Sequence, residues 1–99
     1  MFKEWKVSFV DGAGGQSMFP RMWDRIAPLV DDYAVVTLDE TRNAMRMMAE
    51  KSRVISEGAG ALPLAAVLSG KIRADGPIVC VVSGGNIDLK KFCELTTAA

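Results

Sequence analysis

The sequence contains no histidine, and its two cysteines, Cys80 and Cys93, do not form a C-x-x-C pair. A zinc site built from cysteine and histidine needs three or four such ligands at close spacing, so no metal site of this kind is expected. Both cysteines fall in apolar or helical patterns, where a thiol behaves as a small hydrophobic group. We therefore interpret both as core residues.

Neither sign of charge predominates, because twelve basic and twelve acidic residues give a formal net charge of zero. Proteins that bind nucleic acid or anionic membranes carry basic surfaces, so no nucleic-acid or membrane partner is expected. Zero net charge also removes the repulsion that keeps copies apart, and six methionines supply adaptable apolar surface. The sequence therefore predicts a homo-oligomer.

Long apolar runs are missing as well. No stretch reaches the roughly 18 to 20 apolar residues of a membrane-spanning helix, and residues 1–6 lack the apolar core of a signal peptide. We therefore expect a cytoplasmic location. With 99 residues, of which 49% are hydrophobic, the chain has the length and composition of a single folded domain.

Three segments have strand patterns. Apolar and polar residues alternate from Trp5 to Val10, which is typical of a strand with one buried face. Tyr33 to Val36 is β-branched and aromatic, and Pro77 to Val82 is a continuous apolar run of the kind found inside parallel sheets. The glycine-rich residues 11–15 predict a loop after the first strand.

Helical patterns separate these strands. Residues 20–30 have an apolar helical stripe, although Pro28 weakens its last turn. Thr37 and Glu40 have the spacing of a capping box, which predicts a helix start. One face of that helix is apolar, and its opposite side carries a supportive i,i+4 pair. The apolar face comprises Leu38, Thr41, Met45, Met48 and Ala49, and the pair is Arg46 with Glu50.

Two further helices follow. Residues 60–68 are apolar on all sides and lead into Ser69-Gly70-Lys71, which predicts a buried helix that stops there. Residues 87–95 predict a last helix with Asn86 as its cap. Its inward-facing residues are expected to be Leu89, Phe92 and Cys93.

This alternation of strands and helices predicts the α/β class, with a small, mainly parallel sheet and flanking helices in one domain over residues 1–99. Right-handed crossovers would bring the loops that follow the strands to one edge of the sheet. Ligands bind at that edge in such folds.

The turn Ser83-Gly84-Gly85-Asn86 connects the last predicted strand to the last helix. Unpaired backbone N–H groups at a helix start suit a polar or anionic ligand. The alternative is that the glycines only allow a sharp turn and Asn86 only caps the helix. The residue types leave both interpretations open.

Glu57 and Gly58 directly precede the buried helix. The carboxylate of Glu57 can satisfy the unpaired N–H groups of the helix start, or it can face a pocket. The other acidic pairs are accounted for by capping and by a solvated helix face.

The glycines of 12–15 match neither a dinucleotide fingerprint nor a phosphate-binding P-loop.

Taken together, these motifs resemble a known family. Glu57-Gly58-Ala59-Gly60-Ala61, the apolar helix ending at residues 68–71, and the strand leading into Ser83-Gly84-Gly85-Asn86 follow one another in a specific combination. The combination resembles the closing segment of fold-type II pyridoxal-phosphate enzymes, within the threonine/serine dehydratase (ammonia-lyase) family. The likeness runs from about residue 9 to residue 95.

The resemblance implies roles for six residues in binding pyridoxal phosphate. Ser83 would donate a hydrogen bond to the pyridine nitrogen of the cofactor or share a proton with it. Glu57 would lie near the ring, and Gly58 would give the ring room. The remaining cofactor-binding candidates are Gly84, Gly85 and Asn86.

The resemblance also implies two missing parts. The family's Schiff-base lysine and its run of phosphate-binding glycines precede anything found in these 99 residues. We therefore expect a truncated homologue that has no catalytic residue, does not hold pyridoxal phosphate alone and self-associates. Two alternatives are a subunit that is active with a complementary chain carrying the missing parts, and a regulatory module that binds a small ligand.

Overall fold

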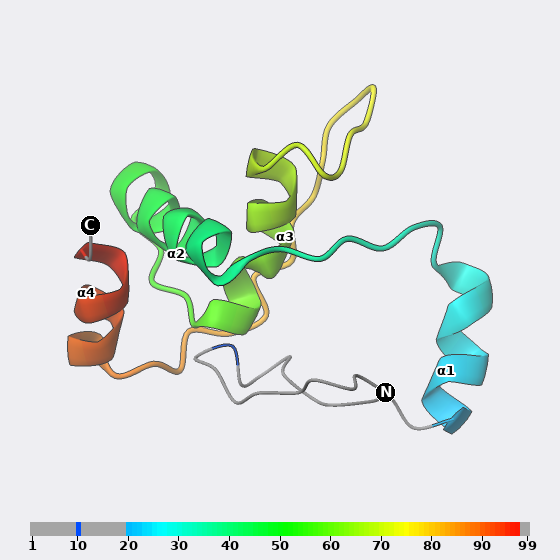
Figure 1. Ribbon diagram of the computed structural model, residues 1–99, viewed down its shortest axis with the longest axis horizontal. Helices are drawn as coiled ribbons and strands as arrows, with labels where there is room; N and C mark the ends of the chain where they lie inside the picture. Colours follow the sequence, from blue (N-terminus) through cyan, green and yellow to red (C-terminus); the bar gives the residue numbers. More distant parts are fainter. Residues whose placement is uncertain (1–9, 11–19, 98–99) are drawn as a thin grey trace.

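The computed structural model describes Val10 and residues 20–97 of the chain. These residues form four α-helices and two short helical turns, which Figure 1 shows in chain order. They are α1 (Pro20–Ile26), η2 (Ala27–Leu29), α2 (Leu38–Met47), the π-helical turn η3 (Met48–Ser52), α3 (Gly58–Leu68) and α4 (Leu89–Thr97).

No residue of the described part lies in a β-strand. The prediction of an α/β fold with a mainly parallel sheet is therefore wrong for this part of the chain. Residues 33–36 and 77–82 lie in segments without helix or strand, because a strand also requires a neighbour that pairs with its backbone N–H and C=O groups. Of the predicted strand over residues 5–10, only Val10 is described, and it is not in a strand; the rest of that strand and the loop over residues 11–15 lie outside the described residues.

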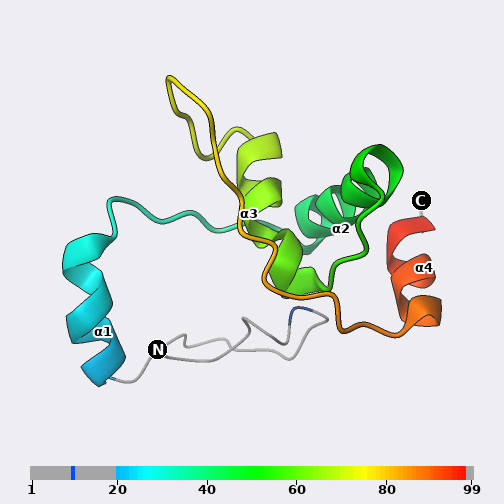
Figure 2. The same cartoon turned by 180° about the vertical axis from the view of Figure 1, so that it is seen from behind.

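The core lies where α2 packs against α3 on one side and α4 on the other (Figures 1 and 2). Small residues let the helix backbones approach, and two methionines and a phenylalanine fill the remaining space. The buried cluster comprises Ala44, Met45, Met48, Ala61, Ala65 and Phe92.

The predicted start of α2 is confirmed. The Thr37 hydroxyl accepts a 3.0 Å hydrogen bond from the Glu40 N–H, and the Glu40 carboxylate accepts a 2.8 Å bond from the Thr37 N–H. Lys71 Nζ also donates to Glu40 Oε1 and to the Val35 carbonyl, both at 2.6 Å. The turn after α3 is thereby tied to the beginning of α2.

The predicted stop of α3 is also confirmed. Its C-terminus is Leu68, and Gly70 adopts φ 77°, a left-handed conformation that favours glycine. The helix begins at Gly58, two residues before the predicted start, and Leu68 is 43% exposed. The prediction that this apolar helix is completely buried is therefore wrong for Leu68, its last residue.

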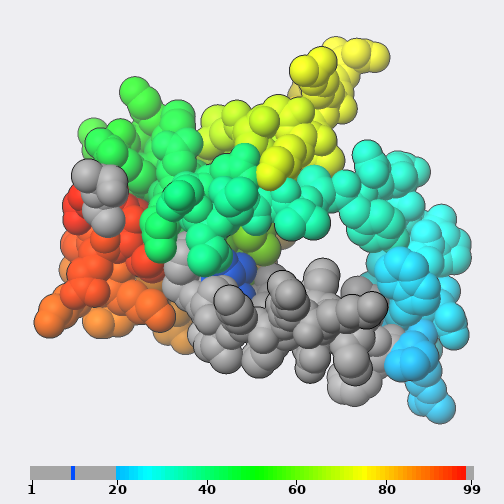
Figure 3. Space-filling view, viewed as in Figure 1, coloured from blue at the N-terminus to red at the C-terminus, as the bar shows by residue number. Residues whose placement is uncertain are grey.

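The α1–η2 segment contacts neither α2, α3 nor α4 within the described part. Figure 3 shows α1 in cyan at one end of the molecule, away from the green and red helices. Trp23 stacks on Tyr33 with ring centroids 6.1 Å apart, yet both remain about half exposed or more, and Leu29 is 80% exposed. The predicted helix exists, but its apolar stripe is not buried among the described residues.

The start of α4 differs from the prediction. The helix begins at Leu89, and its first backbone bond runs from the Phe92 N–H to the Asp88 carbonyl at 2.9 Å. Asn86 therefore lies too early to cap it. Of the three residues expected to face inward, Phe92 is buried, whereas Leu89 and Cys93 are exposed.

No helix in the described ranges combines the length and hydrophobicity that crossing a membrane requires.

Candidate functional site

The two glycine-containing motifs meet in the structure. The Glu57 N–H donates a 3.1 Å hydrogen bond to the Gly84 carbonyl, which joins the start of α3 to the Ser83-Gly84-Gly85 turn. Figure 2 shows this turn, in orange, passing the beginning of α3. The two motifs are 27 positions apart in the sequence, so their contact is a product of tertiary packing.

Close packing explains the glycines at this junction. A Cβ on Gly60 would lie 2.7 Å from the Gly84 carbonyl oxygen, and one on Gly85 would lie 2.7 Å from the Ile55 carbonyl oxygen. A Cβ on Gly84 would lie 2.5 Å from Glu57 Oε1. Glycine is therefore needed at residues 60 and 85, because two backbone segments approach there too closely for any larger residue, whereas at residue 84 the flexible Glu57 side chain could move.

The side chain of Glu57 does not cap α3. Glu57 occupies the N-cap position, but its carboxylate makes no capping hydrogen bond and instead lies against Gly84. The capping interpretation of this residue is wrong, and the carboxylate belongs to the junction of the two motifs. Gly58 is buried in the first turn of α3.

Ser83 and Asn86 lie on either side of the glycine pair, and both are exposed. A 2.9 Å bond from the Ile87 N–H to the Gly85 carbonyl closes a tight turn centred on Asn86. Within the described part, the Ser83 hydroxyl makes no hydrogen bond. This hydroxyl is therefore available to an acceptor or a donor on a ligand.

Ser56 is a polar residue of the junction that the sequence patterns did not single out. It is fully buried, and its Oγ has no hydrogen-bond partner in the described structure. A single serine between Ile55 and Glu57 has no periodicity or spacing that signals burial. Only the packing of the junction makes it distinctive.

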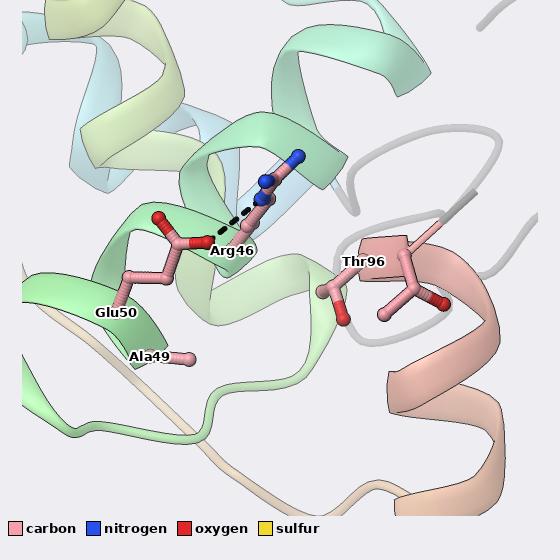
Figure 4. Close-up of a pocket in the computed structure, with 5 residues that line it drawn as sticks. Arg46, Ala49, Glu50 and Thr96 are labelled. Carbon is pink, nitrogen blue, oxygen red and sulfur yellow. Dashed lines mark hydrogen bonds and ion pairs between the residues drawn. The ribbon is translucent and has the colours of Figure 1, made fainter. Parts of the chain in front are cut away.

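A cavity of about 350 Å³ lies elsewhere, between the end of α2, η3 and the last turn of α4 (Figure 4). None of its lining residues belongs to the junction of Glu57 with Gly84. The lining residues are Arg46, Ala49, Glu50, Thr96 and Thr97. The described residues contain no group of three or more acidic or cysteine side chains placed to hold a metal ion.

The junction thus brings the backbone of a glycine-rich turn into close contact with the start of α3. Comparison with known families shows to which class of protein the chain belongs. Residues 2–84 match the family described as pyridoxal-phosphate dependent enzyme. The chain belongs to this family, which uses pyridoxal phosphate, and the family resemblance identified from the sequence is confirmed.

Relatives with assigned functions are similar over most of the chain. A catabolic L-threonine dehydratase, TdcB, of Staphylococcus aureus (strain USA300) is 39% identical over 88 residues, which are 85% of this chain and 25% of that protein. The catabolic L-threonine dehydratase TdcB of Escherichia coli (strain K12) is 42% identical over 77 residues, which are 75% of this chain and 23% of that protein. The chain thus spans about a quarter of the length of these relatives.

Proposed function

We propose that this chain forms the ring-nitrogen side of the pyridoxal-phosphate pocket of a threonine or serine dehydratase and has no turnover alone. The observation that carries the proposal is the hydrogen bond between the Glu57 N–H and the Gly84 carbonyl. It holds both family motifs in one place and leaves the Ser83 hydroxyl exposed beside them.

The residues present fit this part of the cofactor. Ser83 has a neutral hydroxyl without an internal partner in the described part, so it can donate to a pyridine nitrogen or accept from it. Glu57 and Gly58 would border the ring, and Gly84, Gly85 and Asn86 would form the adjoining turn. When bound, pyridoxal phosphate supplies an electron sink for elimination reactions.

A hydroxyl and a carboxylate act differently on a pyridine nitrogen. A carboxylate would favour a protonated ring, whereas the Ser83 hydroxyl would favour the unprotonated ring by donating a hydrogen bond to its nitrogen. The less electron-withdrawing ring suits loss of a β-hydroxyl group from serine or threonine. This supports a hydroxyamino acid as the substrate class of the complete site.

Lys71, which forms hydrogen bonds with residues far from it in the sequence, is unsuited to anchoring the cofactor. An anchoring lysine needs a desolvated, uncharged amine, but Lys71 Nζ lies 2.6 Å from a Glu40 carboxylate oxygen. Lys71 Nζ donates to Glu40 and to the Val35 carbonyl, so it is engaged in these contacts rather than free to attack a cofactor carbonyl. We therefore propose that the chain does not retain pyridoxal phosphate by itself.

Addition of pyridoxal phosphate to the purified chain tests this point. We expect no visible absorption band that survives dialysis, and no lysine modified after borohydride reduction, as measured by mass spectrometry. A stable yellow adduct on one lysine would contradict the proposal.

We further propose that the chain self-associates. Several large apolar side chains are exposed in the described structure, including Val35 at 81%, Val79 at 88% and Val81 at 68%. Exposed apolar area of this kind favours association. Size-exclusion chromatography with light scattering should give a dimer or a larger assembly at micromolar concentration, and a stable monomer would contradict this proposal.

The chain spans only about a quarter of the length of its relatives. This favours a second candidate function, in which the chain is a subunit that is active with a complementary chain. The test is to mix this chain with the part of the Staphylococcus aureus dehydratase that precedes the matched segment. Appearance of the cofactor band and release of a keto acid from threonine would support this candidate. Ser83→Ala should then reduce activity, whereas Ser52→Ala on η3 should not. Failure of any pairing to bind the cofactor would eliminate it.

A further inference from the structure

The cavity between α2, η3 and α4 has two walls of different chemistry (Figure 4). Arg46 and Glu50 lie on the wall formed by α2 and η3, and Thr96 and Thr97 lie on the α4 wall. The volume of about 350 Å³ is at the lower end of the range for small-molecule sites. The cavity shares no residue with the candidate cofactor site.

The first wall presents one fixed charge of each sign. Arg46 Nε donates to Glu50 Oε1 at 2.9 Å. Within the described part, the two Nη groups of Arg46 and the Oε2 atom of Glu50 make no hydrogen bond. The hydrogen bond from Arg46 lowers the pKa of Glu50, which favours the charged carboxylate. The pair therefore retains unused donors next to an unused acceptor.

The second wall presents acceptors. Thr96 Oγ1 donates its proton to the Phe92 carbonyl at 2.8 Å, and Thr97 Oγ1 donates to the Cys93 carbonyl at 2.5 Å. Because each hydroxyl has a single proton, only the lone pairs of these oxygens remain for a ligand. A ligand group that faces this wall must therefore donate.

We infer that this cavity binds a free α-amino acid. The carboxylate of the ligand would accept from the Arg46 Nη groups, and its ammonium would donate to Glu50 Oε2 and to a threonine oxygen. A simple anion would be repelled by the Glu50 carboxylate, and a simple cation would be repelled by the Arg46 guanidinium. A zwitterion with adjacent charges satisfies both residues, and Ala49 leaves room for a small side chain.

The site is independent of the proposed cofactor pocket, and its occupant would join α4 to α2. The experiment is isothermal titration calorimetry of the full chain with glycine and L-threonine, without pyridoxal phosphate. Lactate lacks the ammonium and ethylamine lacks the carboxylate, so we expect heat with the two amino acids and none with these two probes. Threonine binding should persist in Ser83→Ala, which separates this site from the cofactor pocket.

Matched substitutions test which residues bind the amino acid. Arg46→Gln and Glu50→Gln should each weaken threonine binding by about tenfold or more, as expected for loss of a charged hydrogen bond. Arg42→Gln and Asp39→Asn alter the Arg42–Asp39 ion pair on the same helix, outside the cavity lining, and should leave the affinity unchanged. Circular dichroism of each variant should show the helical signal of the unmodified chain.

Three results would overturn the inference. They are the absence of heat with both amino acids, equal binding of lactate and threonine, and unchanged affinity in folded Arg46→Gln and Glu50→Gln.

Discussion

The backbone N–H of Glu57 and the carbonyl of Gly84 form a 3.1 Å hydrogen bond that connects the two motifs of the candidate cofactor site. The contact brings the Glu57 carboxylate against the Cα of Gly84 and places the Ile55 carbonyl over Gly85. The geometry of this junction therefore depends on the absence of side chains at the turn.

Gly85→Ala tests that dependence. The new methyl group would lie 2.7 Å from the Ile55 carbonyl oxygen, and neither backbone can yield as a flexible side chain would. We expect the free energy of unfolding to fall by about 1–3 kcal/mol, measured by urea denaturation. Gly76→Ala is the matched control, because a methyl group there meets no atom within 4 Å. It should be neutral or stabilising by up to about 1 kcal/mol, and equal effects of both changes would contradict the prediction.

Glu40 predicts a specific pH dependence of stability. The hydrogen bond from Lys71, followed by the backbone N–H of Thr37, lowers the pKa of Glu40 from 4.5 to about 2. Because the folded-state pKa is lowered, the stabilisation is fully present above pH 4.5 and is lost as the pH falls from 4.5 towards 2. Urea unfolding at several pH values across this range should show the loss.

Glu40→Gln isolates the charge in that experiment. Glutamine also occupies this position in capping boxes, so its amide oxygen can still accept from the Thr37 N–H. We expect the variant to lose less stability on acidification than the unmodified chain. Lys71→Met should flatten the pH profile in the same direction, because it removes the hydrogen bond that contributes most to the lowered pKa. Profiles parallel to that of the unmodified chain would count against this assignment.

Ser56 and Thr41 are two buried hydroxyl residues with opposite expected effects. Ser56 Oγ has no partner in the described structure, whereas the Thr41 hydroxyl donates to the Thr37 carbonyl at 2.9 Å. Ser56→Ala should leave the melting temperature unchanged or raise it, because it removes a desolvated polar atom. Thr41→Val should lower stability by about 1 kcal/mol because a hydrogen bond is lost. A large destabilisation by Ser56→Ala would show that its hydroxyl has a partner in solution.

Met45 is the largest fully buried side chain of the described core, at 0% exposure. Met45→Ala should lower the free energy of unfolding by about 2–5 kcal/mol, because it removes buried contacts and leaves a cavity between the helices. Met22→Ala in α1 is the control, since Met22 is 48% exposed. Similar thermal unfolding of the two variants, followed by circular dichroism, would place the core elsewhere.

Local signals predicted much of the helical structure. The capping box at Thr37 and Glu40, the glycine stop at Gly70 and the Arg46–Glu50 pair are all present. Each depends on atoms a few residues apart, so the sequence contains the complete interaction. The motifs of the candidate site were likewise visible in the sequence, although their cofactor roles rest on family resemblance and remain a proposal.

The predictions that were wrong depended on distant neighbours. The apolar runs at residues 33–36 and 77–82 lack the partner strands that a sheet requires in the described part, and the apolar stripe of α1 has no covering helix there. An apolar pattern indicates that a segment needs a packing partner, but it does not specify which segment provides that partner. The buried state of Ser56 was not predictable for the same reason.

The sequence by itself determined where α2 starts, where α3 stops and which family the chain belongs to, because those features are encoded in adjacent or closely spaced residues. Only the tertiary structure decided that Glu57 lies against Gly84 rather than capping α3, and that Arg46 and Glu50 face the last turn of α4 across a cavity. Contacts between residues far apart in the chain depend on how the helices pack, which short-range patterns do not specify.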